Sequence, residues 1–216
     1  MKKLKRSILY LSISFFILSC ENENAEGDSS NISNEETKQV DSKKPNEQAE
    51  KESITAIEFS KEIADDLREQ KFNNWATFTT DTVYFSPYAY IDTNKIKSLS
   101  LIEFNRLYDS GEVIEWGTFD GTGEPIMLDL AGYFERFVAD FSLLSEENKI
   151  LKDTIPARGN ELNNVAEIFP DATIVEFHKP ASEESGGMDW RSLMLVLVKK
   201  DGEWKLRAIV HNEWTT

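Results

Sequence analysis

The sequence predicts an α+β fold in which N-terminal helices pack on a curved, mostly antiparallel sheet that ends in a long C-terminal hairpin. Three observations support this prediction. Capping boxes open apolar stripes at helical spacing in the N-terminal half, alternating strand patterns dominate the C-terminal half, and an Asp-Gly turn joins the last two strands. Helices that precede a run of antiparallel strands are typical of a helical layer on one face of a sheet.

The three expected helices follow recognisable start signals. Thr55-Ala56-Ile57-Glu58 and Ser100-Leu101-Ile102-Glu103 are capping boxes, in which a hydroxyl and a carboxylate satisfy the first free backbone amides. Asp129 is the expected N-cap of a third helix, which is rich in aromatic residues, and a short helical turn is expected over 161–168. Together these segments supply the helical layer.

The expected strands follow alternating patterns. Residues 83–91 alternate but contain Pro87, which cannot donate to a ladder and therefore favours an edge position. Residues 113–119 and 125–128 flank a Gly-rich turn, and 173–178 form another strand.

The last hairpin carries the strongest strand signal. Residues 190–199 and 203–214 surround Lys200-Asp201-Gly202, and a two-residue Asp-Gly turn makes paired residue numbers sum to 403. This register places three leucines of the first strand on one face with three apolar residues of the second: Leu193, Leu195, Leu197, Leu206, Ala208 and Val210. It also places Arg191 opposite Asn212, and Ser192 opposite His211. A slip of one residue would exchange the faces.

The chain is expected to divide into three parts. Residues 1–19 have the basic start and eleven-residue apolar stretch of a signal peptide, too short for the roughly 20 residues that a membrane-spanning helix needs. Residues 20–52 begin with Cys20 and continue as an acidic tether without aromatic residues or leucine, a composition that favours disorder. Residues 53–216 are expected to form a single α+β domain.

Ile17-Leu18-Ser19-Cys20 resembles the lipobox of bacterial lipoproteins. The resemblance implies cleavage before Cys20 and attachment of diacylglycerol to its sulfur, with a further acyl chain such as palmitate on the new amino terminus. Two or three acyl chains anchor a protein stably to a membrane. The acidic run Glu21-Asn22-Glu23-Asn24 resembles lipoproteins of the Gram-negative outer membrane and leaves the leaflet open. The alternative is an ordinary secretory signal with a chance cysteine.

Charge and composition exclude several classes of function. The formal net charge is -15, so the sequence argues against nucleic acid as a partner. One cysteine excludes an intrachain disulfide and a cysteine-based zinc site, and two histidines exclude a histidine-rich metal cage. We therefore expect no metal and no cofactor.

The order of elements resembles the NTF2-like (cystatin-like) cone, in which helices pack into a curved sheet. Four stretches also resemble a set of bacterial extracytoplasmic proteins: 85–90, 116–126, 188–192 and 209–215. The resemblance implies a compartment and names no activity.

Two groups of side chains are candidates for chemistry. His211 and Glu213 share a strand face, and a carboxylate beside an imidazole can orient it as a general base. A hydrogen-bonded histidine at the margin of the sheet is the alternative. Ser192 lacks the nucleophile elbow that a serine hydrolase needs.

The second group is the expected mouth of a pocket. Arg191, Asn212, Asp189 and Trp214 gather at the open end of the apolar face, and an arginine there binds a ligand carboxylate bidentately. Trp116 and Tyr88 are further expected ligand contacts, and Tyr84, Tyr88 and Tyr90 are candidates for an aromatic ribbon that binds a sugar or a peptide. A structural Arg–Asp pair is the alternative for the first set, and packing under a loop for the tyrosines.

The sequence therefore predicts a lipid-anchored extracytoplasmic module that binds a small-molecule or peptide ligand. The alternative is an NTF2-like enzyme of isomerase, dehydratase or hydrolase type with His211 as general base. A third hypothesis is a structural envelope protein whose mixed hairpin face forms a homodimer; that face comprises Trp190, Met194, Val196 and Ile209.

Overall fold

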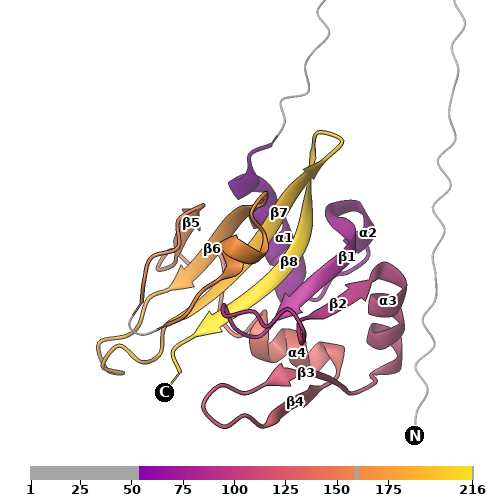
Figure 1. Ribbon diagram of the computed structural model, residues 1–216. Coiled ribbons are helices and arrows are strands. Elements are labelled where there is room, and N and C mark those ends of the chain that lie inside the picture. Colours follow the sequence, from indigo (N-terminus) through magenta and orange to yellow (C-terminus); the bar gives the residue numbers. More distant parts are fainter. Residues whose placement is uncertain (1–53, 159–160, 216) are drawn as a thin grey trace, which may run out of the picture. The chain divides into compact units, whose positions relative to one another are not determined.

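The computed structural model describes residues 54–158 and 161–215 (Figure 1). The expected signal peptide, the lipidated Cys20 and the tether lie outside the described residues. The described part is an α+β fold with five helices and a mixed, mostly antiparallel sheet, as the sequence predicts at this level of detail. Within it, no helix combines the length and the apolar character needed to cross a bilayer.

The helices begin where the sequence predicts. Thr55 and Ser100 form complete capping boxes, and Asp129 accepts from the amide of Gly132 at 2.8 Å. The expected turn within 161–168 is a single helical turn. The structure adds one helix that the sequence analysis missed, a four-residue segment that starts at Trp75. The five helices are α1 Ala56–Arg68, α2 Trp75–Phe78, α3 Leu101–Ser110, α4 Leu130–Phe137 and α5 Val165–Ile168.

A six-stranded sheet has the order β2-β1-β8-β7-β6-β5, and β3 pairs with β4 in a separate two-stranded sheet. Their bounds are β1 Thr79–Ser86, β2 Lys97–Ser100, β3 Ile114–Thr118, β4 Pro125–Leu128, β5 Lys149–Lys152, β6 Thr173–Lys179, β7 Arg191–Lys200 and β8 Glu203–Glu213. The two short edge strands, β2 and β5, were not predicted.

The predicted edge position of the strand around Pro87 is wrong. β1 ends at Ser86, one residue before the proline, so Pro87 removes no hydrogen bond from the ladder. β1 lies inside the sheet, antiparallel to β2 and parallel to β8. Its parallel pairing places the C-terminal ends of β1 and β8 at the same end of the sheet.

The predicted hairpin register is right near the turn and wrong beyond it. Asp201 and Gly202 both have positive φ, 54° and 84°, as a type I′ turn requires, and pairs from Lys200–Glu203 to Leu197–Leu206 sum to 403. A β-bulge at Arg207 then shifts the ladder, so Val196 pairs with Ala208 and later pairs sum to 404. Arg191 therefore faces Glu213, and not Asn212.

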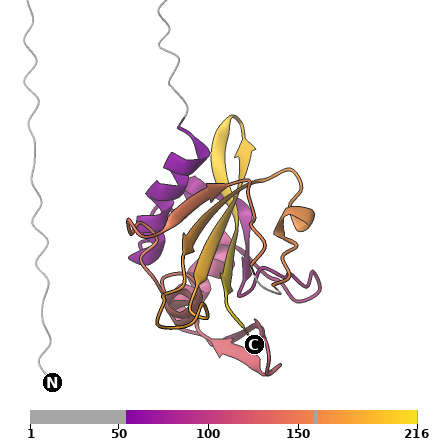
Figure 2. The same cartoon turned by 90° about the vertical axis from the view of Figure 1, so that its left-hand side faces the viewer.

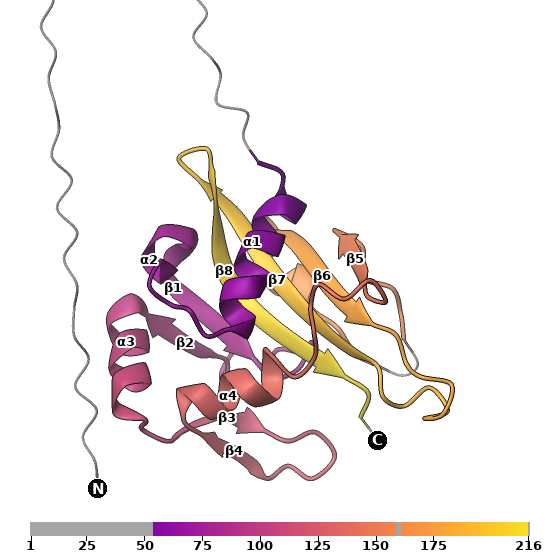
Figure 3. The same cartoon turned by 180° about the vertical axis from the view of Figure 1, so that it is seen from behind.

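Two hydrophobic clusters cover the two faces of the sheet. The larger lies between the sheet and α1 to α4 and is closed by aromatic side chains such as Phe85, Phe134 and Phe137, each 0% exposed. Figure 3 shows α1 and α4 in front of this face. The smaller cluster lies on the other face under α5, so Figure 2 shows α1 and α5 on opposite sides of the sheet.

The packing of these clusters affects two predictions. The space between the sheet and its helices is filled by side chains, so the described residues leave the ligand no room there. The apolar hairpin residues that were expected to face a second subunit are buried within the chain itself: Trp190, Met194, Val196 and Ile209 are at most 8% exposed.

Candidate ligand-binding groove

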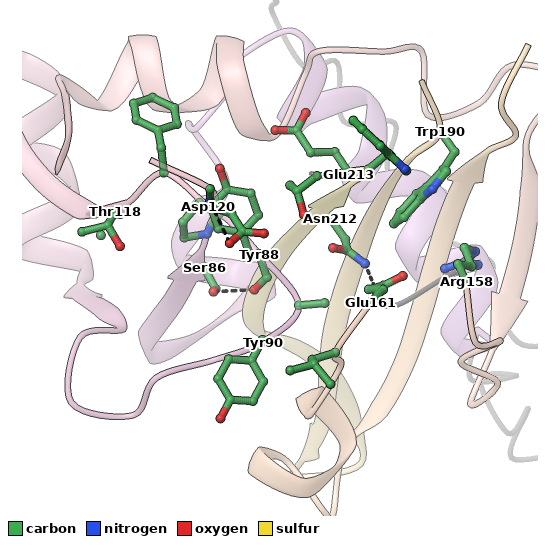
Figure 4. Close-up of a pocket in the computed structure, with 18 of the residues that line it drawn as sticks. Ser86, Tyr88, Tyr90, Thr118, Asp120, Arg158, Glu161, Trp190, Asn212 and Glu213 are labelled. Atoms are coloured by element: carbon green, nitrogen blue, oxygen red, sulfur yellow. Dashed lines mark hydrogen bonds between the residues drawn. The ribbon is translucent and has the colours of Figure 1, made fainter. Parts of the chain in front are cut away.

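A groove of about 1310 Å³ opens at the end of the sheet where β1, β6 and β8 finish and β7 begins (Figure 4). Four connecting segments form its walls: the chain after β1, the turn between β3 and β4, the chain before α5, and the chain between β6 and β7. Its lining includes Ser86, Tyr88, Tyr90, Thr118, Asp120, Arg158, Glu161, His178, Trp190, Asn212, Glu213 and Trp214.

A buried ion pair lies beside the groove floor. Arg158 donates to both oxygens of Glu176, at 2.7 and 3.0 Å, and the Glu176 side chain is only 1% exposed. The guanidinium also lies over the indole of Trp190, 5.5 Å from the ring centroid. Because bidentate pairing and a cation–π contact both fix the planar guanidinium, Arg158 ties the chain before α5 to the sheet.

Glu161 and Asn212 form a hydrogen bond across the same floor (Figure 4). The Asn212 amide donates to Oε1 of Glu161, while Oε2 is buried and has no hydrogen-bond partner among the described residues. Burial raises the pKa of Glu161, and the Asn212 hydrogen bond and the charge of Arg158 offset part of this effect. The Glu161 carboxylate therefore lies on the groove floor without an ion-pair partner among the described residues.

His178 is a second titratable group of the floor that the sequence does not single out. Its Nδ1 contacts the Ser192 hydroxyl at 2.9 Å, and burial, together with the nearby Arg158 charge, lowers its pKa. The neutral ring is thereby oriented by Ser192, whose own side chain is fully buried. A fully buried hydroxyl does not act as a nucleophile toward a groove ligand.

Aromatic side chains form the rim. Tyr90 is 60% exposed and Trp214 is 38% exposed, so both present ring surface to a ligand. Tyr88 is half-buried and contacts Phe137 edge-on, while Tyr84 packs against Phe169 away from the groove. The expected ribbon of three tyrosines is therefore not formed.

The predicted pair His211 and Glu213 belongs to a separate ionic cluster on the helical face of the sheet. The His211 side chain is 0% exposed, with Nδ1 donating to the Pro87 carbonyl at 3.1 Å and Nε2 at 3.4 Å from Asp140. Glu213 binds Arg136 at 2.6 Å and Arg191 at 2.9 Å. The bulge explains this placement, because it moves His211 from the face of Ser192 to the face of Leu193.

Asp140 on this cluster accepts from Arg191 at 2.6 Å. Burial alone would raise the pKa of Asp140, but its contacts with His211 and Arg191 outweigh burial and hold the pKa below its usual range. Asp140, His211 and Glu213 offer three potential metal-ligand atoms within 4.8 Å of one another, and Arg191 already binds both carboxylates. The charges of the cluster are therefore paired, although Oδ1 of Asp140 and Nη1 of Arg136 are buried without a hydrogen-bond partner among the described residues.

Three other predicted residues have different surroundings. Trp116 lines the groove but is only 1% exposed; its Nε1 donates to the Leu128 carbonyl at 2.9 Å, and its ring stacks on Tyr133. Arg191 lies beside α4 and not in the groove. Asp189 accepts from Ser185 and Ser182, which lower its pKa to about 2, so the expected Arg–Asp pair involves Asp140 instead.

The structure thus brings five predicted residues to the groove lining and adds residues from segments without a periodic pattern; the five are Tyr88, Trp116, Asn212, Glu213 and Trp214. Arg158 and Glu161 lie in such a segment. Glu176 did leave a signal, because a glutamate between Val175 and Phe177 interrupts an apolar strand. A buried carboxylate requires a cation nearby, and the sequence does not say which one supplies it.

Glu161→Gln is expected to stabilise the domain at pH 7. Because the folded pKa of Glu161 is raised, its ionised form costs stability above that pKa, and the cost disappears as the pH falls through the folded value toward the unfolded one. Urea unfolding should therefore show a higher free energy of unfolding for the variant than for the wild-type chain at pH 7, and no difference near pH 4. Glu167→Gln, at an exposed site on α5, is the matched control and should leave the free energy of unfolding unchanged at both pH values. A loss of stability at pH 7 would contradict the expected cost.

No protein-family model matches the chain, and no curated protein resembles it significantly. The groove and its charges therefore carry the functional argument.

Proposed function

We propose that the protein is a lipid-anchored extracytoplasmic module with an NTF2-like fold, held at the Gram-negative outer membrane, and that its domain binds a small-molecule or peptide ligand in the groove. The layer of helices on one face of a mixed sheet is compatible with that fold. The Cys20 motif supports the anchor.

The observation that carries the proposal is the combination of a polar floor and an aromatic rim in one large groove. Binding sites are concave, with apolar walls and a few placed polar groups that fix orientation. Here Asn212, Glu161 and His178 supply the polar groups, and Tyr90 and Trp214 supply exposed ring surface.

An NTF2-like enzyme with His211 as general base has less support. A general base must come within hydrogen-bond reach of the proton that it removes. The His211 ring is fully buried and faces Pro87 and Asp140 through its two nitrogens. The geometry therefore favours binding over catalysis at this residue.

Thr122→Trp is expected to block the groove. Thr122 is an exposed residue of the turn between β3 and β4 that lines the groove, so an indole there occupies ligand space. Small-molecule fragments screened by NMR should shift groove resonances in the wild-type chain and bind at least about tenfold more weakly to this variant. Thr154→Trp, at an exposed site outside the groove, is the control. Fragments that bind both variants equally, or only elsewhere, would refute the groove as the binding site.

Cys20→Ser is expected to abolish lipid attachment. A serine hydroxyl does not replace the cysteine thiolate as the nucleophile that accepts the diacylglyceryl group, so labelled palmitate should no longer enter the protein, and the protein should leave the membrane fraction. The wild-type chain, labelled in parallel, is the control. Continued labelling of the variant would show that Cys20 is not the anchor.

A further inference from the structure

Some of the charged side chains that line the groove have ion-pair partners and others do not. Arg158 is neutralised by Glu176, and Glu213 by Arg136 and Arg191. Lys95 and Asp92 form a loose exposed pair at 4.0 Å. Two lining carboxylates remain without an ion-pair partner among the described residues: Asp120 and Glu161. The groove is thus left with an excess of negative charge.

Glu161 is the better placed of the two carboxylates. One of its oxygens is held by Asn212, which fixes the carboxyl group on the floor, and the buried Oε2 has no donor among the described residues. Because the carboxylate has no cationic partner among the described residues, a ligand that brings a positive charge into the groove compensates it. The site therefore favours a cationic ligand over an anionic one.

The aromatic rim and the net charge point to the same ligand chemistry. Exposed faces of Tyr90 and Trp214 attract cations, and the floor already contains one such contact, Arg158 over Trp190. The formal net charge of -15 steers cations toward the protein and repels anions.

We infer that the groove binds a ligand that carries an ammonium group, such as the side chain of a lysine in a peptide, with Glu161 as the anion that receives it. The inference rests on the proposed function, because it names the ligand class for the same groove. The Glu161 carboxylate supplies the counter-charge for the ammonium, the ring of Tyr90 or Trp214 covers the aliphatic stem, and Asp120 adds attraction at the rim.

A matched pair of peptides tests the inference with the full chain. The probes are acetyl-Ala-Lys-Ala-amide and its norleucine analogue, which has a similar aliphatic stem and no charge. NMR titration at low ionic strength should show the lysine peptide binding at least about tenfold more tightly, with shifts at groove residues. Raising the salt concentration should weaken the lysine peptide selectively, because a charge pair at the groove is screened.

Two isosteric variants locate the anion. Glu161→Gln keeps the oxygen that Asn212 contacts and removes the charge, and it should weaken the lysine peptide about tenfold without changing the norleucine peptide. Glu167→Gln makes the same charge change outside the groove and should alter binding less than about twofold.

The outcomes separate this inference from the proposed function. Equal binding of the two peptides, or unchanged binding to Glu161→Gln, would overturn the ammonium site and leave a groove that binds by other contacts. Absence of any peptide shift, while neutral fragments still bind in the groove, would do the same. Absence of both peptide and fragment binding would overturn the proposed function as well.

Discussion

Arg158→Ala is expected to lower the free energy of unfolding by about 3–5 kcal/mol, because it leaves a buried carboxylate without its counter-charge. Glu176 is 1% exposed and receives two hydrogen bonds from this guanidinium. The variant also loses the contact with Trp190, which holds the chain before α5 over the groove. Urea unfolding monitored by circular dichroism measures the loss.

A double variant distinguishes a lost charge partner from lost packing. In Arg158→Met with Glu176→Leu, neither charge remains and most of the side-chain volume is kept, so most of the stability should return. If the double variant is as unstable as Arg158→Ala, packing and not the isolated carboxylate explains the loss. Arg68→Ala, which removes an exposed ion pair on α1, is the control and should change stability by less than about 1 kcal/mol.

The parts of the fold that the sequence predicts are those specified by local interactions. The capping boxes at Thr55 and Ser100 and the N-cap at Asp129 involve residues no more than three positions apart. The turn at Asp201-Gly202 depends on two residues that tolerate positive φ. Such signals can be read without knowledge of the tertiary structure.

The hairpin register beyond Arg207 could not be obtained in this way. A bulge adds one residue to one strand, and both registers of β8 keep apolar residues on each face of the sheet. The consequence is large for the site, because the shift pairs Asn212 with Ser192, so that Asn212 lines the groove, and it turns His211 toward α4.

The groove could be predicted only in part for a related reason. Trp214 and Asn212 lie at the end of a strand, where the pattern indicates an open edge. Arg158 and Glu161 reach the floor from a segment without helix or strand periodicity, and their partners Glu176 and Asn212 are 18 and 51 positions away. Contacts of this kind depend on the tertiary fold and produce no periodic pattern in the sequence.

Trp116→Ala is expected to destabilise the domain by about 3–5 kcal/mol, a loss typical of an aromatic residue removed from a packed core. Trp116 is 1% exposed, lies 4.0 Å from the ring of Tyr133, and donates to the Leu128 carbonyl. Its removal therefore leaves a cavity and an unsatisfied carbonyl between β3, β4 and α4. Thermal and urea unfolding should both detect this loss.

Trp214→Ala is the matched comparison, because the same substitution at the groove rim removes a ring that is 38% exposed. Its effect on stability should stay within about 0.5 kcal/mol, while the affinity of groove ligands should fall several-fold. Trp116→Ala should leave the affinity of the folded fraction nearly unchanged. If instead Trp116→Ala abolishes binding without loss of stability, Trp116 is the ligand contact that the sequence predicts, because it is among the residues that line the groove.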